Sequence, residues 1–409
     1  MLTPLCDVPK MPALKTLHDS ALAQLVEQMT VNHWVAGSSP AGGAKSFTLV
    51  VQGVQSHDAL FAINCRSCSS KYSYHQNADT HVPPSGIDRP SDRKAHMGTI
   101  PLIGGISIYL SVVISSVAFL ELPETFIGIA LICGLVTFIG ALDDRYPLNP
   151  TYRLILQLMA GVSIASMGIS VHSLGDLLGL GHIDLALLAI PFTAVAITGL
   201  CNAYNMVDGI DGLAGSLTLV AMCSLLYLSL DRAPENEVAL LAFLCTSIIV
   251  FLVFNLKARG RSKIFMGDAG SMFLGCSVAI AMVYFSQSGR DVINPTTALW
   301  LVAIPMMDMV STMLRRMLKG QSPLHADRTH LHHIHMHGGL NQHQALFCIV
   351  SVAAICAIIG IFLERVWPQN EMISFLLWLA TFGLYFKFVV KSAFKFAKML
   401  RRQIRFILN

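Results

Sequence analysis

The chain has 409 residues, of which 54% are hydrophobic and only 13% are charged, and its mean hydropathy is +0.60. Such an apolar and charge-poor composition excludes an ordinary soluble protein of this length and predicts an integral membrane protein. The formal net charge is +4, but the basic residues form no pattern typical of nucleic-acid binding, so we expect no nucleic-acid partner.

The N-terminal segment, residues 1–85, differs from the rest of the chain. It contains no run of 18 apolar residues, and its best candidate, residues 47–63, is interrupted by polar side chains. One expectation is a polar, disordered extension. A second hypothesis is a transfer RNA gene translated in frame, because possible codons for residues 23–28 resemble a D-arm and those for residues 37–40 resemble a T-arm.

Apolar runs of about 20 residues, the length that spans a bilayer, recur from residue 99 onward. They predict an all-α, polytopic membrane protein with about ten transmembrane helices, within a membrane domain at residues 86–386. The expected spans are 99–121, 125–142, 154–172, 184–203, 213–230, 237–256, 269–286, 295–314, 345–363 and 372–390. Residues 387–409 form a basic amphipathic tail that should lie on anionic lipid.

Positive charge is distributed unequally between the two ends of these spans. The loops at one end, together with the tail from residue 387, hold 20 Lys and Arg residues, whereas the loops at the other end hold three. Because Lys and Arg accumulate in cytoplasmic loops, the basic end and the C-terminus are predicted to be cytoplasmic.

Aspartates gather in the loops of the same basic end. A single aspartate at a span end can be a helix cap or a turn residue. Several together are harder to explain in this way, because each costs about 2.5–3.5 kcal/mol at membrane depth. We therefore expect one site assembled from several loops, with Asp88, Asp143, Asp144, Asp208, Asp211, Asp268 and Asp327 as candidates.

Asp308 lies inside a predicted span, seven residues before Arg315 and about 10 Å from the span end at 1.5 Å per residue. A carboxylate at this depth is by default a functional hypothesis. A transporter could use it as a proton relay. Against this alternative, no inverted repeat of broken helices is evident, and the carboxylates lie at one end of the spans instead of the midplane.

The chemistry of this acidic end indicates a hard cation and phosphate. Aspartate oxygens suit Mg²⁺, which is commonly bound by one or two carboxylates together with phosphate and water. Basic residues flank the aspartates at 257–263 and 315–328. Carboxylates, Mg²⁺ and basic side chains together are typical of phosphoryl transfer. In a membrane protein, one substrate is then expected to be a lipid phosphate.

Six motifs carry a family resemblance: PLIGGISIY, FIGALDDRY, NAYNMVDGIDGLAGS, KIFMGDAGS, ALWLVAIPMMDM and RRMLKGQSPLHADRTHLHH. In this order and spacing they resemble the polyprenyl-phosphate N-acetylhexosamine-1-phosphate transferases over about residues 86–405. That family has a transmembrane helix before its DRP-like element, so we expect this chain to lack the family's first helix.

The resemblance implies transfer of N-acetylglucosamine 1-phosphate from UDP-N-acetylglucosamine to undecaprenyl phosphate, with release of UMP and with Mg²⁺ or Mn²⁺. It places the protein in the bacterial inner membrane, at the start of O-antigen or common-antigen synthesis, and leaves a homodimer open. The alternative within the class is the phospho-N-acetylmuramoyl-pentapeptide transferase of peptidoglycan synthesis, whose last loop reads differently from SPLHADRTHLHH.

The resemblance also implies roles for single residues. Asp268 is the expected metal ligand, and Asp143 and Asp144 are expected at the phosphates, with Asp143 as a second metal contact or base. A base role is also implied for Asp88. The nucleotide is expected at Asn205, Asp208 and Asp211, and the diphosphate or sugar at Arg328, His330, His332 and His333.

Elementary chemistry qualifies these roles. Neighbouring residues on a helix point about 100° apart, so Asp143 and Asp144 cannot both face one metal unless the helix ends there. Asp208 and Asp211, three residues apart, would share one face of a helix. His333 and His337 could bind zinc as an alternative to phosphate if their segment is helical.

Overall fold

The computed structural model describes residues 87–88, 100–256, 264–287, 289–290, 292–322 and 330–391. The predictions for residues 1–85 and most of the C-terminal tail lie outside these residues. The elements are β1 (Ile87–Asp88), β2 (Ile100–Pro101), α3 (Gly104–Phe119), α4 (Glu124–Arg145), α5 (Pro150–Ser166), η1 (Ala186–Leu188), α6 (Ala189–Val207), α7 (Leu213–Ser229), α8 (Glu235–Asn255), α9 (Gly267–Ser286), α10 (Pro295–Leu301), α11 (Ala303–Leu318), α12 (Leu331–His337), α13 (Gln342–Val366) and α14 (Glu371–Lys391).

Each of the ten predicted spans coincides with a helix, or with the pair α10 and α11. Among the described residues, six helices are long and apolar enough to cross a membrane, and α10 with α11 would make a seventh span. Helices α3 and α7 are apolar but shorter. The prediction of a helical membrane protein is confirmed. The strands β1 and β2, which pair antiparallel, are a small departure from an all-α fold.

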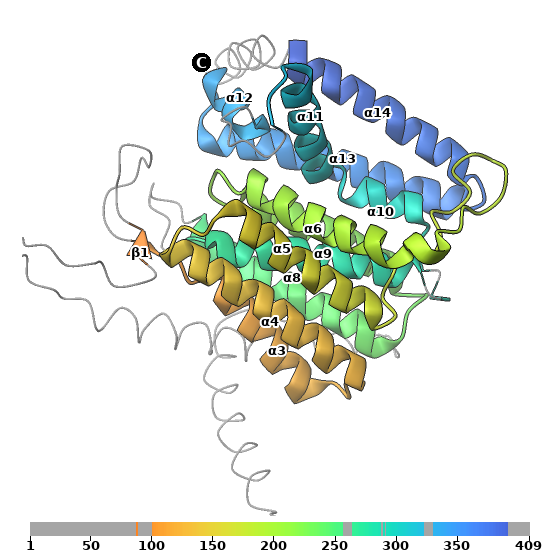
Figure 1. Cartoon of the computed structure of the whole chain (residues 1–409), viewed down its shortest axis with the longest axis horizontal. Helices are drawn as coiled ribbons and strands as arrows, with labels where there is room; N and C mark the ends of the chain where they lie inside the picture. The colour runs from red at the N-terminus through yellow and green to blue at the C-terminus, as the bar shows by residue number, and fades with distance from the viewer. Residues whose placement is uncertain are drawn as a thin grey trace, which may run out of the picture. The chain divides into compact units, whose positions relative to one another are not determined.

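Helix α9 lies at the centre of the bundle, against α3, α4 and α6 (Figure 1). In its most apolar 18-residue window 83% is buried, compared with 17–50% for the other long helices. Glycines bring the backbones together. A Cβ on Gly140 of α4 would lie 2.5 Å from Cα of Ala269, and a Cβ on Gly105 of α3 would overlap the backbone of Gly270. The start of α9 is therefore fixed by direct backbone packing.

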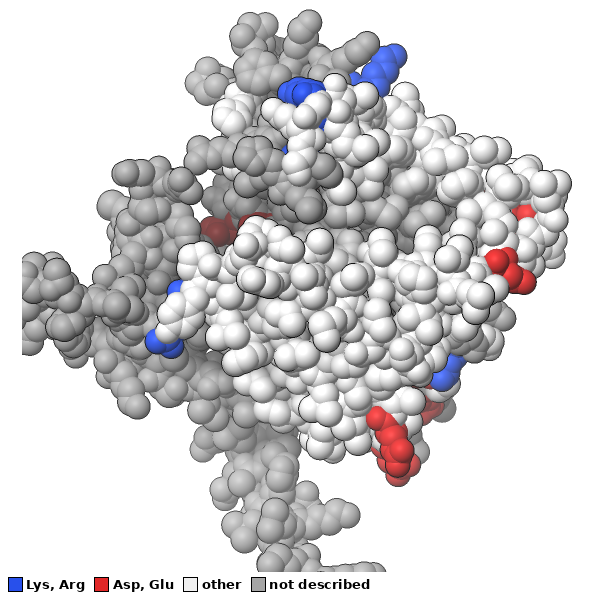
Figure 2. Space-filling view, in the orientation of Figure 1, with Lys and Arg blue, Asp and Glu red and all other residues white. Residues whose placement is uncertain are grey.

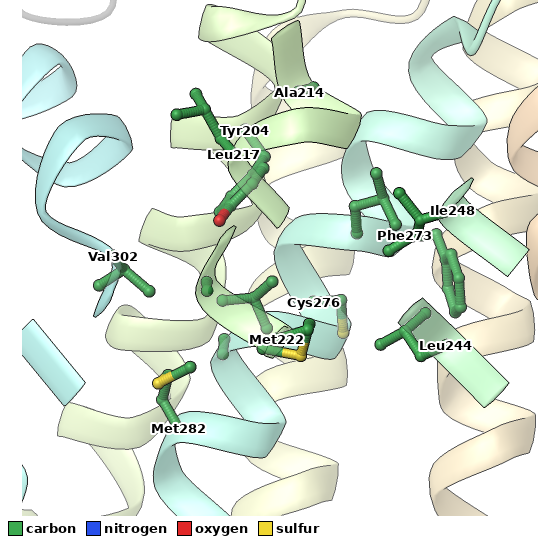
Figure 3. Close-up of a cluster of buried hydrophobic side chains, with 14 of the residues drawn as sticks. Tyr204, Ala214, Leu217, Met222, Leu244, Ile248, Phe273, Cys276, Met282 and Val302 are labelled. Carbon is green, nitrogen blue, oxygen red and sulfur yellow. The ribbon is translucent and has the colours of Figure 1, made fainter. Parts of the chain in front are cut away.

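Apolar side chains from several helices fill the space around α9 (Figure 3). Tyr204 of α6, Met222 of α7 and Cys276 of α9 are fully or almost fully buried. Ile248 of α8 closes the same cluster. The core thus packs the four helices α6, α7, α8 and α9 together.

The chain bends by 82° between α10 and α11. Pro305 lies in the first turn of α11 and has no N–H to donate to the carbonyl of Leu301, which is where α10 ends. After the bend, α11 packs against α6, α13 and α14 (Figure 1).

The three arginines predicted for the less basic end do meet at one end of the bundle. Arg232 pairs with Glu364 at 2.9 Å, Arg365 pairs with Asp231 at 2.7 Å, and Arg290 pairs with Glu237. These contacts connect the end of α7 to the end of α13, and the loop after α9 to the start of α8. They agree with the prediction that the loops carrying these three arginines lie at the same end of the bundle.

Candidate active site

Asp144 holds the first turn of α9. Its Oδ1 accepts the backbone N–H of Asp268 at 2.8 Å, and its Oδ2 accepts that of Ala269 at 3.2 Å. These N–H groups have no partner within the helix, so a carboxylate from α4 serves as the cap. Gly267 just before them has φ +72°, a conformation that suits glycine. Asp144 thereby fixes the position of Asp268.

Asp268 is itself oriented by polar neighbours. Its Oδ1 accepts a hydrogen bond from Asn205 Nδ2 at 2.8 Å, and the same nitrogen donates to Ser271 Oγ at 3.0 Å. The Asp268 side chain nevertheless keeps 39% of its surface exposed. It is a carboxylate in a defined position with an oxygen available to a ligand.

Arg153 connects Asp268 to Asp143. Its guanidinium lies 2.6 Å from Asp143 Oδ2 and 3.6 Å from Asp268 Oδ2. The other oxygen of Asp143 accepts the N–H of Leu148 at 2.7 Å. Helix α4 ends at Arg145, as the condition for both carboxylates to face one site required, and Asp143 and Asp144 are held by different partners there. Arg153 was not among the predicted site residues; its only sequence signal is a basic residue shortly after DDR.

Asp208 and Asp211 lie in the turn between α6 and α7. The expectation that they share a helix face is wrong, because α6 ends at Val207 and Gly212, with φ +77°, precedes α7. The two remain electrostatic neighbours. Burial, followed by the charges of Asp268, Asp144 and Asp211, raises the pKa of Asp208 to about 8. The turn thus brings a further carboxylate to the group around Asp268.

The histidine segment packs on this turn. His332 is buried on α12, and a Cβ on Gly209 would overlap its Nε2. Burial, then the neighbouring His333, lowers the pKa of His332 to about 3, so its ring is neutral at physiological pH. The ring of His330 lies parallel to that of His332, with centroids 6.1 Å apart.

Three predicted residues are described in part or not at all. The backbone of Asp88 pairs with Ile100 in the β1–β2 ladder, and the next residue, Pro101, accepts the N–H of Phe265 at 3.0 Å. This backbone chain leads from the Asp88 element toward the start of α9. Arg328 and Asp327 lie outside the described residues.

A metal ion would have to share its ligands with a substrate. Within the described ranges, no three His, Cys, Asp or Glu residues form a group that could hold an ion. Mg²⁺ typically takes one or two carboxylates and fills its other positions with water and phosphate. Asp268 Oδ2 is held only by the 3.6 Å ion pair with Arg153, and the pKa of Asp208 is raised by burial and then by the charges of neighbouring carboxylates, which a cation would offset. These residues fit such an ion, whereas a zinc site at His333 and His337 has no third ligand in the described part of the chain.

Fold and site together define a membrane-embedded helical protein with clustered carboxylates, an asparagine and histidines at one end of its bundle, a constellation suited to phosphate chemistry. Figure 2 shows acidic side chains set back in a recess of the visible face. Comparison with known proteins agrees. Residues 126–286 match the model of glycosyl transferase family 4.

Curated relatives extend the match over most of the chain. The undecaprenyl-phosphate alpha-N-acetylglucosaminyl 1-phosphate transferase of Yersinia pestis is 38% identical over 326 residues, 77% of this chain and 87% of that protein. The proteins of the same name from Escherichia coli K12 and Haemophilus influenzae are each 36% identical, over 77% and 78% of this chain and 86% and 90% of theirs. The chain belongs to this family of glycosyl-1-phosphate transferases, as its motifs predicted.

Proposed function

We propose that the chain transfers N-acetylglucosamine 1-phosphate from UDP-N-acetylglucosamine to undecaprenyl phosphate and releases UMP. The names of its relatives support the sugar phosphate and the lipid acceptor. The observation that carries the proposal is the placement of a partly exposed Asp268 at the start of α9, between Asn205 at one carboxylate oxygen and Arg153 at the other.

In the proposed reaction, an oxygen of the lipid phosphate forms a bond to the phosphorus that carries the sugar. The bond from that phosphorus to the oxygen bridging to UMP breaks, and UMP leaves with the electron pair. The second pKa of a phosphate monoester is about 6, so the acceptor is largely dianionic at neutral pH. No side chain has to remove a proton from it.

The carboxylates consequently act mainly by position and charge. Both oxygens of Asp144 are bonded to the start of α9, and both oxygens of Asp143 are bonded to Arg153 and Leu148. These bonds favour positioning roles over a base role for either residue. Asp268 would hold Mg²⁺ or Mn²⁺, which supplies neutralisation of the diphosphate charge when bound.

Other residues bind the substrate. Asn205, Asp208 and Asp211 would contact the nucleotide, since they border Asp268 from the α6–α7 turn. His330, His332 and His333 would donate to phosphate or sugar oxygens, together with Arg328. Asp88 is proposed at the same site because its strand leads to the start of α9.

We place the site on the cytoplasmic face of the bacterial inner membrane, with about ten spans, and the product at the start of O-antigen or common-antigen synthesis. The excess of Lys and Arg in the loops near the site supports this orientation. Sealed inside-out vesicles should use added UDP-sugar, which cannot cross a bilayer, whereas sealed right-side-out vesicles should not.

A donor assay tests the reaction. Purified protein in nanodiscs containing undecaprenyl phosphate is given labelled UDP-N-acetylglucosamine or labelled UDP-N-acetylmuramoyl-pentapeptide, with Mg²⁺. We expect a lipid-linked product and an equal amount of UMP from the first donor only. A product from the pentapeptide donor alone would favour the peptidoglycan reaction, and no lipid product from either donor would contradict both.

A further inference from the structure

Asp308 is the carboxylate that the proposed reaction leaves unused. Its side chain is 1% exposed and accepts hydrogen bonds from three groups on different elements. Oδ2 lies 3.0 Å from His330 Nδ1, while Oδ1 accepts the Leu331 N–H and the Tyr385 hydroxyl, each at 3.1 Å. A side chain of α11 thereby connects the start of α12 to α14.

These contacts determine the tautomer of His330. An ionised carboxylate can only accept hydrogen bonds, and here it faces one certain donor, the Leu331 N–H, as well as a hydroxyl. The contact with His330 is therefore a hydrogen bond donated by Nδ1–H. Nε2 is the one ring nitrogen of His330 that remains for a ligand.

Asp308 also places the ring. His330 is the residue before α12, has no side-chain cap of its own, and leaves the N–H of Leu331 without a partner inside the helix. Asp308 supplies that partner from another helix. Since α12 also carries His332 against Gly209, the same anchor sets the distance between His330 and the Asp208 turn.

We propose that Asp308 and Tyr385 are positioning residues that present His330 Nε2 to a phosphate oxygen of the UDP-sugar, an inference that rests on the proposed phosphate-binding role of His330. Phosphate oxygens are acceptors, so Nε2 must donate. The bound ring then carries a hydrogen on both nitrogens, and the carboxylate of Asp308 balances its positive charge.

A double-mutant cycle tests this linkage. Asp308→Asn keeps the shape of the side chain but removes its charge, and its amide can donate to His330 and reverse the tautomer. We expect kcat/KM for the UDP-sugar to fall about 10- to 100-fold, by analogy with the loss typical when the hydrogen-bond partner of a metal-ligating histidine is removed. His330→Gln should cause a similar loss. The double variant should be no worse than the more impaired single variant, because both changes remove the same interaction.

Tyr385→Phe is the milder variant, and it keeps the proposal testable if Asp308→Asn folds poorly. It should reduce kcat/KM by less, and only while His330 is present. Ser374→Ala removes a different hydrogen bond of α14, the one from Trp300 Nε1, and should leave kcat/KM within about twofold. Independent, multiplicative losses in either cycle, or an unchanged kcat/KM in Asp308→Asn, would overturn the proposal.

Failure of the proposed function would look different. If the wild-type protein transfers no sugar phosphate, titration calorimetry with UDP-N-acetylglucosamine and Mg²⁺ measures the same linkage without turnover. The inference then requires that Asp308→Asn binds UDP-N-acetylglucosamine more weakly than the wild type. It also requires that the losses of binding free energy in Asp308→Asn and His330→Gln do not add in the double variant. Equal affinities, or no binding by the wild type, would reject it.

Discussion

His332 lies so close to Gly209 that the turn between α6 and α7 has no room for even one methyl group beside the ring. The contact joins two segments that are 123 residues apart in sequence and brings the buried histidine to the residue next to Asp208. A side chain at position 209 and the present position of the His332 ring are thus mutually exclusive.

Gly209→Ala should therefore displace His332. We expect an increase of about 10-fold in the KM for the UDP-sugar, because a misplaced binding group loses its interaction with substrate. Gly199→Ala on α6 is the matched control, since the nearest atom to its Cβ would be 3.7 Å away. Steady-state kinetics in nanodiscs measures both variants. An unchanged KM in Gly209→Ala would show that His332 does not contact the substrate.

Asp268→Asn should reduce transfer by about 100-fold or more, because it removes a charged ligand from the expected ion. Asp231→Asn is the control at the opposite end of the bundle, where Asp231 is 57% exposed and pairs with Arg365. It should retain activity within about twofold. Mg²⁺ titrations of both variants give the measurement. A near-normal rate and metal requirement in Asp268→Asn would refute the metal assignment.

Arg153→Gln should lower kcat by about 10-fold and also lower the Mg²⁺ concentration that gives half-maximal rate. The first effect follows from loss of the partner that orients Asp143, and the second from removal of a positive charge 3.6 Å from Asp268. Arg145→Gln, an exposed neighbour in the same stretch, should change neither quantity appreciably. A higher Mg²⁺ requirement in Arg153→Gln would argue against its placement beside the ion.

His332 should make stability depend on pH. Its pKa of about 3 in the folded chain lies below the ordinary value of 6.5, so the unfolded chain takes up the proton first as pH falls. Stability is unaffected well above pH 6.5, declines below it, and stops declining only near pH 3. Between pH 7.5 and 5.0 the loss should be about 2 kcal/mol.

Thermal unfolding in detergent at these two pH values tests that dependence. His332→Gln should reduce the fall in Tm on acidification, whereas His337→Gln, an exposed change on the same helix, should not. Identical falls in wild type and His332→Gln would mean that His332 is not buried in neutral form.

The sequence allowed the helices to be located because a span is a local property: about 20 apolar residues are needed whatever lies beside them. The gathering of Asp208, Asp211 and Asp268 at one end was also predictable, since all lie at span ends. Roles set by distant partners were not. Arg153 and Asp268 are 115 residues apart, and Asp308 and Tyr385 are 77 apart, so no local pattern joins them.

Two local expectations failed or were incomplete for identifiable reasons. Asp208 and Asp211 were expected to share a helix face, but α6 ends at Val207 and Gly212, with φ +77°, turns the chain before α7. The range 295–314 reads as one continuous apolar span. The structure divides it at Val302, where Pro305 withholds a backbone donor.

The glycine contacts of α9 give the site one rigid and one adjustable half. With Gly105 and Gly140 packed onto the backbone of Gly270 and Ala269, α9 can neither rotate nor slide without a steric clash. The histidine segment is instead attached through the side chain of Asp308 and through the contact of His332 with Gly209, so substitutions at these contacts can change its position without moving α9. The histidine half is therefore the part that we expect to adapt to donors with sugars of different size. To change the donor preference, α12 and its flanking loops should be exchanged between relatives.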